Sequence, residues 1–177
     1  MISSHAWYVA YTKSCMERKV MQELEENGVA AYVPIQKELR QWSDRKKWVD
    51  RLVIPGMVFI RTTETQRPQL LARFPALTRF MGSRRQGPFR PAVVPDVEME
   101  RFRQMVSRSS APVTLAPESL QPGDLVRIVR GSLTGLECEL VCIGGRHTAA
   151  VRLGLLGAAT VEIGLADVEK SASKALS

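Results

Sequence analysis

The chain has 177 residues, 45% of them hydrophobic, and a net charge of +7; this suits one large or two small domains and excludes wholesale disorder. No apolar run approaches the roughly 18 residues that cross a bilayer, and the first residues show no secretory leader, so we expect a cytoplasmic protein without a membrane partner. Three cysteines, Cys15, Cys138 and Cys142, fit a reducing compartment. Cys138 and Cys142 are spaced to share one strand face, as core residues or as a metal or redox pair.

The positive charge is concentrated in the first two thirds of the chain. Residues 1–118 carry 19 Lys and Arg against 12 Asp and Glu, whereas residues 119–177 carry six of each. Residues 65–95 contain six arginines and no acid. Such a concentration of positive charge favours a surface that binds a polyanion, most of all a nucleic acid. The alternative is a basic surface without a ligand, which only keeps the protein soluble.

The chain opens with an aromatic, β-rich segment, Ala6–Tyr11, which predicts a strand. Ser14 and Glu17 have the spacing of a capping box, in which each side chain bonds to the backbone N–H of the other residue. Apolar residues then recur at helical spacing up to Asn27-Gly28, a pair typical of a left-handed helix end. We therefore predict a strand followed by a helix.

The next segments alternate between strand and helix patterns. A polar, charged run at 40–51 predicts a hairpin arm or loop. The Pro55-Gly56 step inside an apolar run indicates a bend that presents a sheet surface, because central strands tolerate neither residue well. We expect an α+β sandwich, a mainly antiparallel sheet covered by helices. Its other segments are strands at 29–35, 53–61 and 78–82, helices at 68–74 and 95–106, and a basic turn at 84–91.

Residues 108–118, rich in Ser and Pro and without periodicity, predict a flexible linker between a domain at 1–107 and a second at 119–171. Every later segment favours β structure, and Gly144-Gly145 suits a two-residue hairpin turn. Such short strands avoid exposed edges by curling into a small all-β barrel. They are predicted at 124–130, 137–143, 147–153, 159–163 and 166–169.

Catalysis has little support in this sequence. His5 and His147 are the only histidines, and neither lies near a triad pattern; His147 is expected to cap a turn. No phosphate-binding glycine loop, zinc spacing or other metal or cofactor motif occurs. Carboxylates that are distant in the sequence could still meet in the fold and form a catalytic site. A binding or regulatory protein is nevertheless favoured over an enzyme.

Several motifs, in order and spacing, resemble the NusG family of transcription elongation factors over nearly the whole chain. The string Gln41–Lys47 is similar to the specialised, operon-specific antiterminators of the UpxY/RfaH-like kind. The resemblance implies an NGN domain and an SH3-like KOW barrel. The other matching motifs are Trp7-Tyr8-Val9, Val33-Pro34, Ile54–Ile60, Phe80-Met81-Gly82, Gly123–Ile128 with Gly131 and Gly135, Val161-Glu162 and Asp167–Lys170.

The resemblance implies that the NGN domain docks through an apolar patch on the clamp helices of the RNA polymerase largest subunit. Aromatic and Met side chains anchor such interfaces well. Met57 stands where the family often carries an aromatic residue, and Met fills the same kind of pocket with a flexible chain. An internal core role for these residues is the alternative, most of all for Ile54 and Phe80. The expected patch comprises Tyr8, Ile54, Pro55, Met57 and Phe80.

In the family, a charged hairpin lies beside the non-template DNA strand of the transcription bubble. Cations neutralise phosphates there, while indole faces stack on unpaired bases. A solvated hairpin with cross-strand ion pairs is the alternative. The expected nucleic-acid contacts are Arg40, Trp42, Arg45, Lys46, Lys47 and Trp48.

The KOW barrel of the family recruits a ribosomal protein or the termination factor Rho. The contacting loop maps to Leu155, Leu156 and Gly157, whose leucines could equally be barrel core. Ala158 follows where general factors often carry Arg. This departure fits a specialised factor that need not support termination.

The resemblance therefore implies a monomeric, non-enzymatic factor without cofactors, which binds RNA polymerase and suppresses pausing or termination. A general elongation factor that couples polymerase to Rho or the ribosome is the nearest alternative. A KOW-type ribosome-binding or RNA-binding protein is less favoured, because the barrel half carries no net charge.

Overall fold

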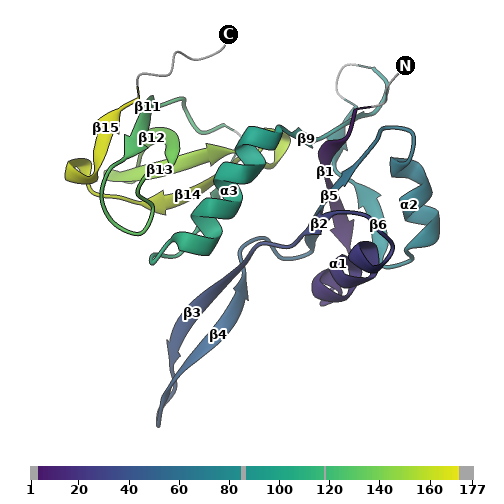
Figure 1. Cartoon of the computed structure of the whole chain (residues 1–177), viewed down its shortest axis with the longest axis horizontal. Helices are drawn as coiled ribbons and strands as arrows, with labels where there is room; N and C mark the ends of the chain where they lie inside the picture. Colours follow the sequence, from purple (N-terminus) through teal and green to yellow (C-terminus); the bar gives the residue numbers. More distant parts are fainter. Residues whose placement is uncertain (1–3, 85–86, 118, 172–177) are drawn as a thin grey trace. The chain divides into compact units, whose positions relative to one another are not determined.

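The computed structural model describes residues 4–84, 87–117 and 119–171. It consists of an α+β part with an antiparallel sheet and an all-β part near the C-terminus, so the predicted fold class is confirmed (Figure 1). The chain divides into two compact units, one made of Met1–Pro34 and Ile54–Asp96, the other of Ile35–Val53 and Val97–Ser177. The domain boundaries at residues 107 and 118 stay a prediction.

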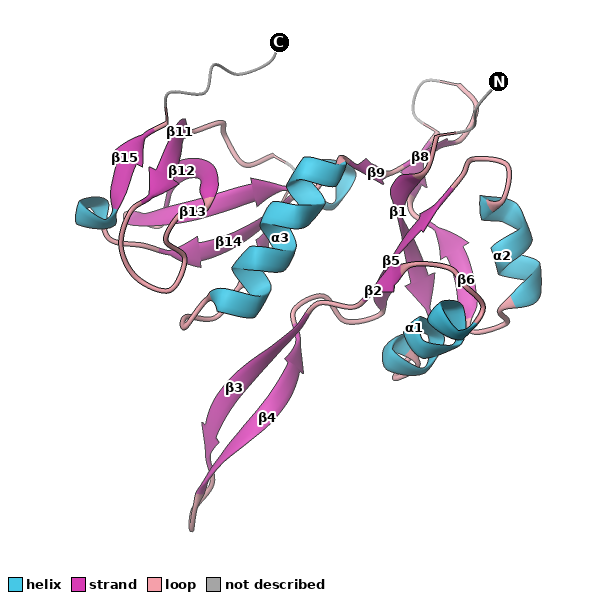
Figure 2. Ribbon diagram, viewed as in Figure 1, coloured by secondary structure: helices cyan, strands magenta, loops and turns pink. Residues whose placement is uncertain are grey.

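The first unit is built on an antiparallel sheet with the strand order β2-β5-β1-β6, in which β9 also pairs with β1. Its core includes Val9, Val58 and Phe59, all with no exposed surface. Helices α1 and α2 lie beside this sheet (Figure 2). The elements are β1 (Ala6–Thr12), α1 (Glu17–Glu26), β2 (Ala31–Tyr32), β5 (Met57–Thr62), α2 (Arg67–Arg73), β6 (Leu77–Phe80) and β9 (Val93–Val94).

Helix α1 ends as predicted, at Asn27 and Gly28, where Gly28 has a φ of +75°. The capping box at its start was a wrong prediction, since no side chain caps the helix. Instead, the buried Glu17 accepts a hydrogen bond of 2.7 Å from the backbone N–H of Gly56. The carboxylate therefore ties the helix to the turn before β5, a partner that local sequence spacing could not reveal.

Several predicted strands have different limits in the structure. The strand expected at 29–35 is limited to the two residues of β2, and the one expected at 53–61 begins only at Met57, after the Pro55-Gly56 turn. The end of the basic segment predicted as a turn at 84–91 is a strand, β8 (Arg90–Pro91), which pairs with β7 (Gly82–Ser83). Arg85 lies outside the described residues.

The charged run forms a hairpin, as predicted, but a longer one. Strand β3 (Ile35–Gln41) pairs with β4 (Lys46–Leu52) over seven residue pairs. In the described part of the chain these two strands form a sheet of their own, without a third strand. We call this element the arm.

The base of the arm is held by the side chain of Gln36, which is only 6% exposed. Its amide nitrogen donates to the carbonyl oxygens of Ser109 and Ala111 at 3.4 and 2.8 Å. Its amide oxygen accepts from the backbone N–H of Val113 and from Arg51, which also donates to the Val113 carbonyl at 2.8 Å. The arm is thus bonded to the segment that follows α3.

The second unit also contains α3 and a six-stranded antiparallel sheet with the order β10-β14-β13-β12-β11-β15. Gly144 and Gly145 form the predicted turn, with φ values of +58° and +79°. Arg101 of α3 pairs with Glu137 of this sheet at 3.0 Å. The elements are α3 (Asp96–Arg108), β10 (Thr114–Ala116), β11 (Asp124–Ile128), β12 (Glu137–Ile143), β13 (Arg146–Arg152), β14 (Ala158–Glu162) and β15 (Val168–Lys170). The segment predicted as a linker therefore contributes strand β10.

The two cysteines of β12 do not share an environment, contrary to the prediction from their spacing. Cys138 is 3% exposed, and burial raises the pKa of its thiol to about 12. Cys142 is exposed near the glycine turn, where the end of the strand lacks cover. Among the described residues no group of three or more His, Cys, Asp and Glu could hold a metal ion. Nor does any helix there have the length and apolar character to cross a membrane.

Replacing Gln36 tests the attachment of the arm. In Gln36→Ala, the Val113 N–H loses its partner, and the Ala111 carbonyl keeps only the bond from the Ser109 hydroxyl. The free energy of unfolding should therefore fall by about 1–3 kcal/mol. Hydrogen exchange should show faster exchange of the Val113 amide. The matched control, Gln41→Ala at the exposed end of the same strand, should change neither quantity, and equal effects of both variants would contradict the account.

Thiol labelling tests the two cysteine environments. Iodoacetamide attacks only accessible thiolates, so the native protein should gain two adducts rapidly, on Cys15 and Cys142, which are exposed. Cys138 should react only in denaturant. Peptide mass spectrometry identifies the labelled residues, and rapid labelling of native Cys138 would refute the placement of this side chain.

Candidate functional site

The structure divides the predicted apolar patch into buried and accessible residues. Tyr8, Ile54 and Phe80 are 5%, 3% and 5% exposed, which makes them core residues. Pro55 is exposed and Met57 is half-buried. Only these last two offer surface to a partner.

Tyr8 and Phe80 do lie together, on the sheet face that α2 covers. Their rings meet edge to face, with centroids 6.2 Å apart. The guanidinium of Arg67, in α2, lies 5.7 Å from the centroid of the Tyr8 ring and 5.3 Å from that of Phe80. The prediction that both rings belong to an accessible patch is not supported, because the helix occupies that face.

Met57 lies on the opposite face of the sheet. It is the register partner of Tyr11, and residues directly opposite in an antiparallel pair share a face. Tyr11 is half-buried, and the Arg79 guanidinium lies 4.5 Å from the centroid of its ring. Sequence reasoning missed Tyr11, although strict alternation along β1 places it on the face opposite to Tyr8.

An ionic network fixes the α2 side of the sheet. Glu64 pairs with Arg67 at 2.6 Å. The hydrogen bond from Arg67 lowers the pKa of Glu64, and burial together with the neighbouring Glu64 raises the pKa of Tyr8. The charge of Arg67 is thus balanced locally, and its guanidinium serves as a packing plane for aromatic rings.

The arm displays large side chains to solvent. Trp42 and Trp48 are 57% and 63% exposed, and Leu39, opposite Trp48 in the register, is 47% exposed. Isolated exposed apolar residues are common, but two exposed indoles on one hairpin are not explained by packing. They are available to stack on a partner.

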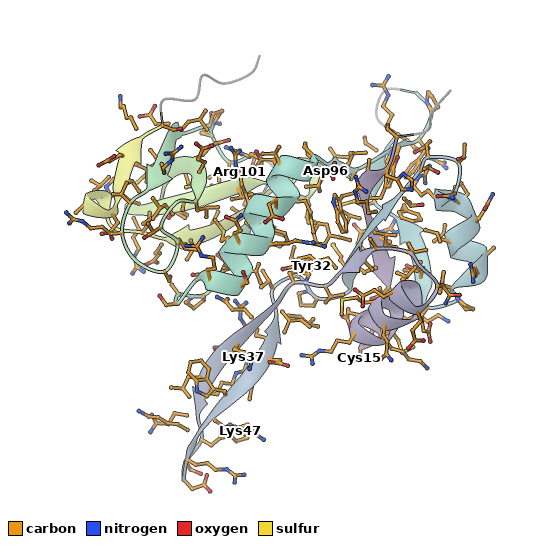
Figure 3. The ribbon with its side chains drawn as sticks, viewed as in Figure 1. Cys15, Tyr32, Lys37, Lys47, Asp96 and Arg101 are labelled. Carbon is orange, nitrogen blue, oxygen red and sulfur yellow. The ribbon has the colours of Figure 1, made fainter. Side chains whose placement is uncertain are left out.

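Cations at the outer half of the arm lack acidic partners. Arg40 stands directly opposite Lys47, a like-charge pair that destabilises a hairpin. Among the described residues, Arg45, Lys46 and Lys47 form no ion pair, while Arg40 has only a loose one with Glu38 at 3.7 Å. Lys37 and Lys47 extend from the arm in Figure 3. The outer half therefore presents uncompensated positive charge.

The predicted nucleic-acid residues occupy two faces and a turn. Lys46 and Trp48 lie on one face of β4, and Lys47 lies on the other, because successive residues of a strand alternate between its faces. Trp42 and Arg45 close the connecting turn, where the Trp42 N–H donates to the Arg45 carbonyl at 2.8 Å. This division depends on the limits of the two strands, which the polar residue pattern did not define. A single strand of nucleic acid would contact one face and the turn.

The loop expected to recruit partners through the C-terminal sheet is largely internal. It forms a 3₁₀ turn, Gly154–Leu156, in which Leu156 is buried. Gly157 is also buried and has a φ of +101°, and Ala158 has no exposed surface. Leu155 alone of the three predicted contacts keeps partial exposure.

Comparisons with known proteins agree with the motifs. Residues 5–103 match the family model "NusG: Transcription termination factor nusG". No curated protein sequence matches the chain. Solved structures with some similarity include NusG of Thermotoga maritima, at 22% identity and a TM-score of 0.45, covering 94% of this chain and 97% of that one.

Two further similar structures are the MjSpt4:Spt5 complex in conformations A and B. Each is 12% identical, with TM-scores of 0.28 and 0.29, and the alignments cover 93% and 95% of this chain and 97% of the other. These low scores carry no argument about function. The family model, in contrast, spans more than half of the chain, and on that match the chain belongs to the NusG family of transcription factors.

Proposed function

We propose that the protein is a transcription elongation regulator that binds RNA polymerase and suppresses pausing or termination, in the manner of an operon-specific antiterminator. It acts by binding, and no catalytic step is involved. Contacts that favour the closed polymerase clamp would lower the population of paused conformers, since a ligand shifts an equilibrium by its differential affinity for the two states.

The arm carries this proposal. Its outer half combines two exposed indoles with three cations, Arg45, Lys46 and Lys47, that form no ion pair with a described residue. Lys47 also faces the like charge of Arg40. A hairpin selected only for stability would place opposite charges across the strands. Phosphates would relieve this repulsion, and unpaired bases would stack on Trp42 or Trp48. The non-template strand of a transcription bubble offers both.

The sheet face that carries Met57 is the proposed docking surface for the clamp helices. Pro55 lies close to Met57 in the chain, and Tyr11 is its cross-strand partner on the same face. Tyr8, Ile54 and Phe80 are buried, so they offer a partner little surface. A flexible Met can fill a pocket on a helical partner, and Tyr11 adds the aromatic ring that position 57 lacks.

A specialised branch is favoured over a general factor by the C-terminal sheet. The loop that would contact a ribosomal protein or Rho has only Leu155 partly accessible, and Ala158 offers no charge. Polymerase and non-template DNA are therefore the partners that we propose. Recruitment of a ribosomal protein or Rho is an outcome that the experiment distinguishes.

Single-round transcription with the cognate polymerase, on a template with a pause and a terminator, tests this function. The wild-type protein should increase readthrough of both. Met57→Asp should abolish the effect, because a buried carboxylate at the interface lowers polymerase affinity by about tenfold or more. Changing Arg45, Lys46 and Lys47 together to Ala should weaken it.

The matched controls are Met57→Leu, which keeps an apolar side chain, and Arg45→Lys with Lys46→Arg and Lys47→Arg, which keeps the charge. Both should retain most of the readthrough. Increased Rho-dependent termination by the wild type would instead indicate a general elongation factor. If polymerase does not bind the protein at all, the proposal fails, and binding of ribosomal RNA would then favour the KOW-type alternative.

A further inference from the structure

A pocket of about 540 Å³ opens in the first unit at β6, the terminal strand of its sheet. Its volume lies in the range of small-molecule sites, roughly 300–1,000 Å³. The walls come from Tyr11 of β1, from β6 and Met81, from α2, from Gly82 of β7, and from Arg84 and Phe89. The arm contributes nothing to it. The residues used below are Arg79, Met81, Gly82, Arg84 and Phe89.

The inner wall of the pocket is built around the ring of Phe89. Gly82 lies against this ring so closely that an added Cβ would collide with it and with the carbonyl oxygen of Arg90. Arg67 and Arg84 lie 5.5 and 5.9 Å from the ring centroid. The absence of a side chain at position 82 and the two guanidinium groups thus fix the ring at the pocket.

Two arginines at the pocket lack acidic partners. Arg79 and Arg84 are exposed, and neither forms an ion pair with a described residue. Arg67, by contrast, is neutralised by Glu64. No described residue with a carboxylate lines the pocket, and residues 65–95 contain no acid at all. The pocket therefore favours an anionic ligand.

We propose that this pocket binds one nucleotide of a single-stranded nucleic acid. The base would lie against Phe89 and Met81, and the flanking phosphates would contact Arg79 and Arg84. Stacking on an aromatic ring beside cations is a usual way to hold unpaired bases with little sequence preference. An acidic peptide would satisfy the arginines, but its carboxylates supply no aromatic face to stack on the Phe89 wall.

This site is separate from the arm, whereas Tyr11, which also lines the pocket, belongs to the proposed polymerase face. The test therefore uses the full-length protein without polymerase. Binding of a fluorescein-labelled oligothymidylate of about 12 nucleotides, a length within the usual site sizes, is measured by anisotropy at several salt concentrations. The variant Arg79→Ala with Arg84→Ala is compared with the wild type. Both are also measured in a background with Arg45, Lys46 and Lys47 changed to Ala.

The pocket variant should bind about tenfold more weakly in both backgrounds. Its salt slope should fall by about 1.4, as expected when two phosphate contacts to a single strand are lost. The control removes two cations from the second unit, Arg130→Ala with Lys170→Ala, and should cost much less. Arg79→Lys with Arg84→Lys should retain most of the affinity, and Phe89→Leu should weaken binding without changing the salt slope.

Photocrosslinking with an oligomer that contains 4-thiothymidine locates the contact. Crosslinks should appear in peptides with Met81 or Phe89 and disappear on competition with unlabelled oligothymidylate. Equal affinities of the pocket variant and the Arg130/Lys170 control, or crosslinks confined to the arm, would overturn the proposal. It would also be overturned if the pocket variant kept its oligonucleotide affinity and lost affinity only for polymerase, because the pocket would then be a protein-docking surface.

Discussion

The arm depends on one constraint, the hydrogen bonding of its base by Gln36. Two strands without a third cannot bury an apolar face, and an isolated hairpin is marginally stable in water. Gln36 and Arg51 compensate by satisfying the backbone of residues 109–113 with buried hydrogen bonds. The anchored base allows the outer half to carry exposed indoles and unpaired cations that would otherwise destabilise it. The hydrogen bonds that stabilise the arm and its proposed DNA contacts thus lie at opposite ends of one hairpin.

The proposed contacts are divided between the two units. The Met57 face and the Arg79/Arg84 pocket belong to the first unit, and the arm belongs to the second. The contact area of each site alone is small, because Met57 is half-buried and a nucleic acid strand can reach only the turn and one face of the arm. Joined in one chain, weak contacts reinforce each other through their effective concentration, which raises avidity by about 10²–10⁴ when the geometry permits. Such a factor would stay bound to a complex that offers polymerase and unpaired DNA together. It would dissociate quickly from polymerase alone or from DNA alone.

Local patterns in the sequence predicted the elements that depend on local physics. The helix end at Gly28, the turn at Gly144-Gly145 and the hairpin followed from positive-φ glycines and from polar composition. Failures arose where the deciding partner is distant. Glu17 bonds to Gly56 rather than to a capping serine. The sequence predicted a helix at 68–74, but not that α2 would cover Tyr8 and Phe80. The pocket at Arg79 and Arg84 was visible only as a run of arginines, because its aromatic wall requires the close contact of Phe89 with Gly82.

The central claim is that the arm contacts the non-template strand while the protein is bound to polymerase. Site-specific photocrosslinking tests it most directly, with p-benzoylphenylalanine in place of Trp42 and elongation complexes whose two DNA strands carry different labels. The account predicts a crosslink to the non-template strand that requires polymerase and is lost when Met57→Asp is added. Crosslinking to the template strand, equal crosslinking without polymerase, or no crosslink from a variant that still binds the complex would contradict it.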